Sequence, residues 1–177
     1  HVGAGVEAGM ERIVAAISEV LAAYEGRTML LLETMAGQGS EIGGSFEELA
    51  VLLDRLGNPP NVGICMDSAH MFAAGYDLRT PEAVAETLAQ ADRAFGLERV
   101  KVFHLNDSKT PFGSRKDRHE QIGRGTLGRH GIASIVNDPF LRQLPFILET
   151  PVERPEDYAE QIAAVRELVR EDTGGNS

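Results

Sequence analysis

The sequence of 177 residues contains a single cysteine, Cys65, and no tryptophan. One cysteine excludes an intrachain disulfide and favours a reducing, cytoplasmic setting. Apolar runs stay well short of the roughly 20 residues that cross a bilayer, so we expect no signal peptide and no membrane partner. Basic residues are scarce as well, with 17 Lys and Arg against 27 Asp and Glu. That balance disfavours a nucleic-acid partner unless metal ions neutralise some of the carboxylates.

Short apolar segments alternate with segments of helical period along the chain. The apolar segments are residues 28–33 (TMLLLE), 61–67 (NVGICMD), 99–107 (RVKVFHLND) and 145–150 (PFILET). The helical patterns cover residues 5–26, 45–57, 80–96, 130–144 and 154–171, and a long polar loop runs from about 108 to 128. This alternation predicts parallel strands joined by right-handed crossovers, and therefore an α/β fold. We expect a single domain over residues 1–172 and a disordered tail over 173–177.

Several positions predict where the helices begin. Ser45 and Glu48 stand in the spacing of a capping box at the start of the second helical segment. Thr80 precedes Pro81, as an N-cap residue precedes proline at the first helical position.

The predicted strands end on residues that bind metals. In chain order these residues are Glu33, Asp67, His104 and Glu149. In parallel α/β folds the carboxyl ends of the strands meet at one edge and face the ligand. Three carboxylates and an imidazole gathered there would repel one another and lose hydration, whereas a divalent cation favours the ionised carboxylates. One such glutamate is more often a solvated residue or a helix cap, but four together predict a site for Zn²⁺, Mn²⁺ or Fe²⁺.

A second set of metal-binding residues lies close to the first in the sequence. His70 follows Asp67 by three residues, and the long loop places Asp117 and His119 two residues apart. In an extended segment two such side chains face the same side. One aspartate and two histidines would supply three ligands of a zinc ion that keeps open positions. The loop triplet alone is a weak signal, because a charged loop is usually only solvated.

The long loop also concentrates positive charge in an acidic protein. Lys109, Arg115, Lys116 and Arg118 all lie within it. This exception fits an anionic substrate that reaches the metal site, although a solvated loop would look the same.

Four segments together resemble the signatures of the endonuclease IV family of apurinic/apyrimidinic endonucleases (deoxyribonuclease IV). They are ETMAGQGSEIG, DSAHMFAAGYDLRT, HLNDSKTPFGSRKDRHEQIGRGTLG and FILETP. The resemblance covers essentially the whole chain and implies a (β/α) TIM-barrel fold. It also implies a hydrolase of DNA base excision repair, in which three zinc ions assist cleavage of the phosphodiester bond 5′ to an abasic site.

The resemblance implies roles for individual residues. The paired metals would be held by Glu33, Asp67, His104 and Glu149, with Glu33 as the bridge and with catalytic roles for Glu33 and Glu149. The third metal would be held by His70, Asp117 and His119. The backbone of abasic-site DNA would be contacted by Gln38, Ser108, Lys109 and Arg118.

The sequence departs from the family pattern in its length. The family barrel has eight strands, whereas this chain predicts four, which correspond to the C-terminal half. Two histidine ligands of the paired metals have no counterpart, so seven of nine ligands and two sites with complete ligands remain. We expect one metal to be lost or weakly held, and the nuclease activity of this chain to be low or nil. The open edges of such a half-barrel predict a homo-oligomer or association with a missing N-terminal half.

Two alternatives stay open at this point. A sugar isomerase or epimerase of the xylose isomerase type also carries Glu, Asp, His and Glu at strand ends, around Mn²⁺ or Mg²⁺. A non-catalytic remnant could bind metal and turn nothing over. The second set of ligands argues against the isomerase, which has no need for a further zinc ion.

Overall fold

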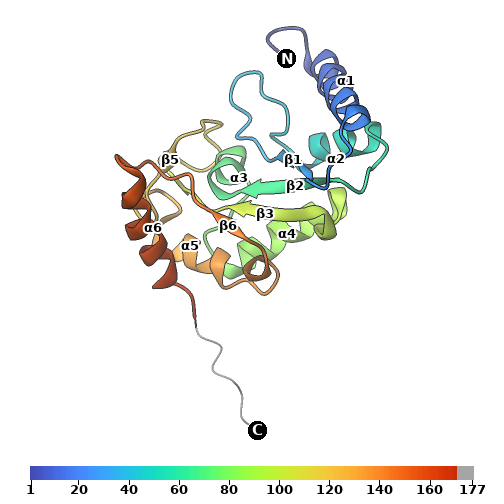
Figure 1. The fold of residues 1–177 in the computed structure, drawn as a ribbon. Helices are drawn as coiled ribbons and strands as arrows, with labels where there is room; N and C mark the ends of the chain where they lie inside the picture. Colours follow the sequence, from blue (N-terminus) through green and yellow to red (C-terminus); the bar gives the residue numbers. More distant parts are fainter. Residues whose placement is uncertain (171–177) are drawn as a thin grey trace.

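A computed structural model describes residues 1–170 and shows a parallel sheet with helices packed along it (Figure 1). Its four strands are β1 (Leu30–Glu33), β2 (Val62–Asp67), β3 (Val100–His104) and β6 (Phe146–Ile147), in the order β1-β2-β3-β6. Every neighbouring pair in this sheet is parallel, as the alternation of segments predicted. The tail predicted at 173–177 and the last residues of the predicted domain lie outside the described residues.

The register of the sheet aligns the strand ends. Glu33 pairs with Cys65, and Asp67 pairs with His104. All six residues of β2 are buried, which explains why its sequence is apolar until the last position. β1 and β6 form the two edges of the sheet.

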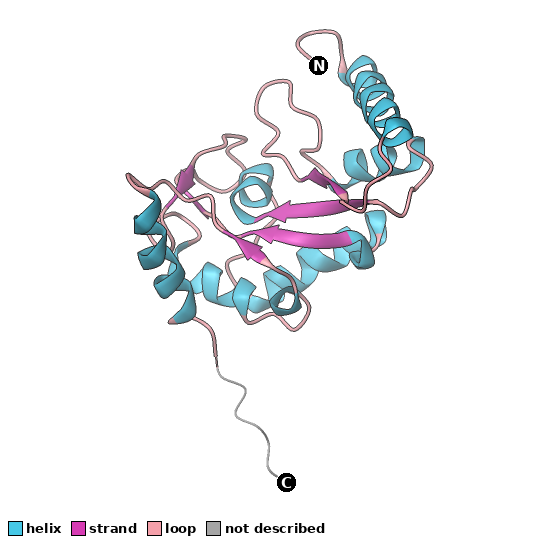
Figure 2. Cartoon of the chain, viewed as in Figure 1, coloured by secondary structure: helices cyan, strands magenta, loops and turns pink. Residues whose placement is uncertain are grey.

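Six α-helices complete the described part of the chain (Figure 2). They are α1 (Val6–Ala23), α2 (Phe46–Arg55), α3 (Ser68–Ala74), α4 (Pro81–Phe95), α5 (Gly128–Val136) and α6 (Tyr158–Arg166). Short 3-10 helices are η1 (Leu97–Arg99), η2 (Leu141–Gln143) and η3 (Pro155–Asp157). Helices α1, α2, α4, α5 and α6 pack against one another in that order. Within residues 1–170, no helix is both long enough and apolar enough to span a membrane.

The predicted helix starts are found, with one difference in the capping. The Ser45 hydroxyl accepts a hydrogen bond from the backbone N–H of Glu48 at 3.2 Å, and the Thr80 hydroxyl accepts one from that of Ala83 at 3.2 Å. The Glu48 carboxylate does not complete a capping box. It accepts instead from the backbone N–H groups of Gly43 and Gly44, and so it fixes the loop before α2.

Three predicted boundaries were wrong. The helix predicted over 130–144 stops at Val136, because Pro139 has no N–H to continue it and Asp138 caps η2 instead. The strand predicted over 145–150 is paired only at Phe146–Ile147. The loop predicted over 108–128 contains a short antiparallel pair, β4 (Asp107–Ser108) with β5 (His119–Glu120). This pair brings the two ends of the long loop together.

Candidate metal centre

The four residues at the strand ends converge. Glu33, Asp67, His104 and Glu149 offer ligand atoms that all lie within 4.8 Å of one another. His104 Nδ1 lies 3.2 Å from Glu33 Oε1, 3.1 Å from Glu149 Oε2 and 3.9 Å from Asp67 Oδ2. We call this set the paired cluster.

The electrostatics of the paired cluster favour a cation. Burial raises the pKa of Glu33, but hydrogen bonds from His104 and His70 outweigh it and hold that pKa at about 2. Hydrogen bonds to Cys65 and Glu33 raise the pKa of His104 to about 11. The carboxylates thus impose a negative potential that draws a proton to the imidazole, and a divalent ion can supply the same positive charge.

The second predicted set also converges. Asp117 Oδ1 lies 3.3 Å from His70 Nε2 and 3.4 Å from His119 Nε2, and the two Nε2 atoms lie 3.4 Å apart. We call this set the triangular cluster. Tetrahedral zinc at about 2.0–2.1 Å from its ligands requires them to be about 3.3–3.4 Å apart, so three protein ligands match the face of such a site.

Backbone carbonyls fix the orientation of both imidazoles. His70 Nδ1 lies 2.8 Å from the Thr34 carbonyl, and His119 Nδ1 lies 3.2 Å from the Glu149 carbonyl. A carbonyl oxygen only accepts, so each Nδ1 donates and each neutral ring turns a lone pair on Nε2 towards Asp117. Two lone pairs and a carboxylate facing one another repel, and in the metal-free protein a proton on His70, whose pKa is raised to about 9, relieves this repulsion; a metal ion can take the place of that proton. The donor set and its outer hydrogen bonds therefore fit a divalent metal ion.

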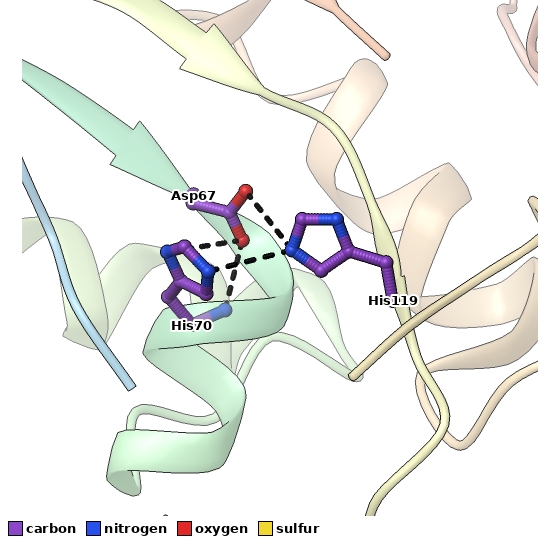
Figure 3. Close-up of side chains that lie close together, drawn as sticks. All are labelled: Asp67, His70 and His119. Carbon is purple, nitrogen blue, oxygen red and sulfur yellow. Dashed lines mark hydrogen bonds and ion pairs between the residues drawn. The ribbon is translucent and has the colours of Figure 1, made fainter. Parts of the chain in front are cut away.

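Asp67 belongs to the paired cluster and also lies within ligand distance of His70 and His119 of the triangular cluster, as Figure 3 shows. It is fully buried at the end of β2, where its Oδ1 accepts from the backbone N–H of His70 at 2.8 Å and caps α3. Its Oδ2 lies 3.9 Å from His104 Nδ1 and 3.8 Å from His119 Nε2. Burial raises the pKa of this carboxyl, which a nearby metal ion would offset.

Comparison with known proteins agrees with this arrangement. Residues 1–168 match the protein-family model described as "Xylose isomerase-like TIM barrel". The chain belongs to the xylose isomerase-like TIM barrel family. The predicted α/β TIM-barrel fold class is thereby confirmed.

Within the xylose isomerase-like TIM barrel family, the chain is similar to proteins named for endonuclease IV. It is 52% identical over 163 residues to "Probable endonuclease 4" of Moorella thermoacetica, covering 92% of this chain and 58% of the relative. It is 49% identical over 174 residues to the protein of the same name from Chloroflexus aggregans, covering 96% of this chain and 60% of the relative. The crystal structure of endonuclease IV from Thermus thermophilus matches with a TM-score of 0.77 and 39% identity, covering 90% of this chain and 57% of that one. The predicted resemblance to endonuclease IV is confirmed, and the chain spans about 60% of the length of these curated relatives.

Several residues that hold the clusters were missed in the sequence. The Thr34 hydroxyl accepts from the backbone N–H of Asp67 at 2.8 Å, while the Thr34 carbonyl faces His70. The Asn106 side chain contacts both Asp67 and Glu149. Thr34 directly follows the predicted ligand Glu33, and Asn106 lies two positions beyond the predicted ligand His104. Their position at the strand ends could have indicated a role in the site. Uncharged side chains are common at strand ends, however, and do not by themselves indicate metal binding.

Asp107 is a further buried carboxylate, and its role was not predicted from the sequence. Its oxygens accept from the backbone N–H groups of Ser108, Gly125, Leu127 and Gly128 at 2.8–3.2 Å. These bonds close the long loop at the start of α5. The loop that carries Asp117 and His119 is therefore anchored directly behind the end of β3.

The four predicted DNA contacts divide into two kinds. Gln38 Oε1 accepts from the backbone N–H of Asp117 at 3.1 Å, which joins the loop after β1 to the long loop. Ser108 is only 1% exposed, and its hydroxyl donates to the Thr110 carbonyl at 3.0 Å, so it holds the loop and does not face solvent. Lys109 and Arg118 are exposed. Their backbones meet where Lys109 N donates to the Arg118 carbonyl at 2.8 Å.

Proposed function

We propose that this chain acts in a metal-dependent DNA-repair endonuclease that hydrolyses the phosphodiester bond 5′ to abasic sites. Support comes from relatives named endonuclease 4 and from a triangular cluster with zinc-like spacing beside the paired cluster. The triangular cluster is the observation that carries the proposal. A sugar isomerase has no need for a further zinc ion held by His70, Asp117 and His119.

We assign Zn²⁺ as the metal because both clusters combine imidazole nitrogens with carboxylate oxygens. Glu33, Asp67, His104 and Glu149 would hold the paired site, for which Mn²⁺ or Fe²⁺ are competing ions. His70, Asp117 and His119 would hold the triangular site. When bound, such ions polarise a phosphodiester and lower the pKa of water.

The protein residues have separate tasks in this proposal. Glu33 stays ionised throughout the neutral range because its pKa is about 2. Glu149, with a side chain 47% exposed, reaches the open side of the paired cluster, where it meets substrate. Lys109 and Arg118 provide exposed positive charge next to Asp117 and favour the approach of a DNA phosphate. Gln38 and Ser108 support that loop from within.

Replacing Glu149 with glutamine tests the function and the paired cluster together. We expect the variant to lose the zinc of the paired site and to incise an oligonucleotide with one abasic site at least about 100-fold more slowly than wild type, beyond the loss typical of an outer hydrogen-bond partner. Elemental analysis and the incision assay are run on the same samples. Exposed Glu153→Gln, four residues away, is the matched control.

Each outcome of that experiment has a distinct meaning. Unchanged zinc content in Glu149→Gln would refute the ligand assignment. Wild-type protein that binds zinc fully and never incises would favour either a non-catalytic metal-binding role or an endonuclease that needs the two histidine ligands without a counterpart here. Turnover of a sugar with Mn²⁺ would support the isomerase instead.

We also propose that the sheet edges are covered in solution, by a second copy of the chain or by an N-terminal half supplied by a longer protein. β1 and β6 are unpaired on their outer sides, and Ile147 of β6 is 45% exposed. Beside β1, an apolar groove is lined by Val20, Leu21, Tyr24, Thr28, Met29 and Leu30. Open parallel edges with apolar surroundings favour association. We expect light scattering to give a mass above the 19.1 kDa of one chain, and a monodisperse monomer would contradict self-association.

A further inference from the structure

The side chain of Asn106 joins two strand ends through opposite sides of one amide. Its Nδ2 donates to Asp67 Oδ2 at 2.7 Å, and its Oδ1 accepts from the Glu149 backbone N–H at 2.8 Å. A carboxylate only accepts and an N–H only donates, so the amide has a single satisfactory orientation. Asn106 is fully buried, and water cannot replace either partner.

The backbone of Asn106 is held as firmly as its side chain. Its N–H donates to the Ser68 hydroxyl at 2.8 Å, and that hydroxyl donates to the Asn106 carbonyl at 2.7 Å. Ser68 is itself fully buried at the start of α3, immediately after Asp67. The amide is thus fixed relative to the end of β2 by two independent connections.

The contact with Glu149 extends to the triangular cluster. The bond from Asn106 places the Glu149 peptide, and the carbonyl of the same residue faces His119 Nδ1 at 3.2 Å. Because this carbonyl binds Nδ1 of His119, the other ring nitrogen, Nε2, faces Asp117. Asn106 therefore contacts the paired cluster directly, through Asp67. It reaches the triangular cluster only indirectly, because the Glu149 peptide that it holds also faces His119.

We propose that Asn106 is a positioning residue that couples the two clusters, so that its loss weakens zinc binding at both. The inference rests on the proposed function only in taking the clusters as zinc sites. The amide of Asn106 prevents the Asp67 carboxylate from rotating away from the space between the clusters, and it keeps the Glu149 peptide in the orientation that His119 requires.

The test measures zinc affinity of the full chain by competition with a chelator, using Asn106→Ala and Asn106→Asp. Asn106→Asp has the same shape and still accepts from Glu149, but its ionised carboxylate cannot donate to Asp67, so it reports on the coupling even if the alanine variant fails to fold. The matched control is Asn137→Ala, which removes an amide that bridges the Ala133 and Leu168 carbonyls and the Arg170 N–H, none of which belongs to a cluster.

We expect Asn106→Ala to bind zinc about 10- to 100-fold more weakly at both clusters, with Asn137→Ala like wild type. The triangular cluster is measured separately in the Glu149→Gln background, which removes a paired-cluster side chain and keeps the carbonyl that faces His119. There, a further loss with Asn106→Ala supports the coupling. A loss confined to the paired cluster, or folded Asn106 variants with wild-type zinc affinity, would overturn it. Wild-type protein without zinc affinity would instead refute the proposed function.

Discussion

Asp67→Asn is expected to remove zinc from both clusters at once, the largest change we predict for one substitution. Asp67 is the residue common to the two groups of ligands. The substitution removes the negative charge and turns an amide against Asn106, where the Asp67 Oδ2 atom now accepts at 2.7 Å. In either orientation the new amide nitrogen would oppose a donor, which is the Asn106 amide or the His70 backbone N–H, so both the charge and the geometry fail.

Two measurements check this result. Elemental analysis should find little zinc in the variant, and added zinc should no longer raise its unfolding temperature, because a ligand stabilises only the state that binds it. Asp54→Asn, an exposed position on α2, should keep both properties of wild type. A variant that loses one zinc and keeps the other would show that Asp67 is not shared.

Zinc affinity should rise steeply with pH between about 6.5 and 9. In the metal-free protein, burial lowers the pKa of His70, but Glu33, Asp67 and Asp117 outweigh it and raise this pKa to about 9. The pKa of His104 reaches about 11. Each ring must lose one proton before its own cluster binds a metal, so the zinc affinity of each cluster should increase by up to about tenfold per pH unit in this window.

The stability of the metal-free protein should change in the opposite direction. A histidine whose pKa is higher in the folded than in the unfolded chain stabilises the fold below its unfolded value of about 6.5, and that contribution disappears as pH rises through the folded value. Metal-free protein should therefore lose stability from about pH 6.5 towards 9 through His70, and further towards 11 through His104. Zinc should compensate for this loss.

Chelator competition at several pH values, with calorimetric measurement of the protons released, tests the prediction. Exposed His130→Ala should leave the slope unchanged. An affinity independent of pH would mean that His70 and His104 are not ligands. The same conclusion would follow if the free energy of unfolding changed equally with pH in the metal-free and the zinc-loaded protein.

Much of the fold was predictable because its signals are local. The apolar run that ends at Asp67 gave a strand buried at every position, and the N-caps at Ser45 and Thr80 were found where the sequence placed them. The edge strand was harder to predict. PFILET looks like a six-residue strand, yet the Glu149 N–H bonds to the Asn106 side chain instead of a neighbouring strand. Nothing near Glu149 in the sequence indicates that partner.

The sequence by itself determined the order of strands and helices and the types of ligand at the strand ends, because both follow from periodicity and from the chemistry of Asp, Glu and His. Only the tertiary structure decided that Asp67 lies close to the ligands of both clusters, that carbonyls of Thr34 and Glu149 face His70 and His119, and that the Asn106 amide joins Asp67 to the Glu149 backbone. These relations depend on the register between strands that lie far apart in the chain. A hydrogen bond of an uncharged amide is set by distances of a few tenths of an ångström, which no local pattern of residues encodes.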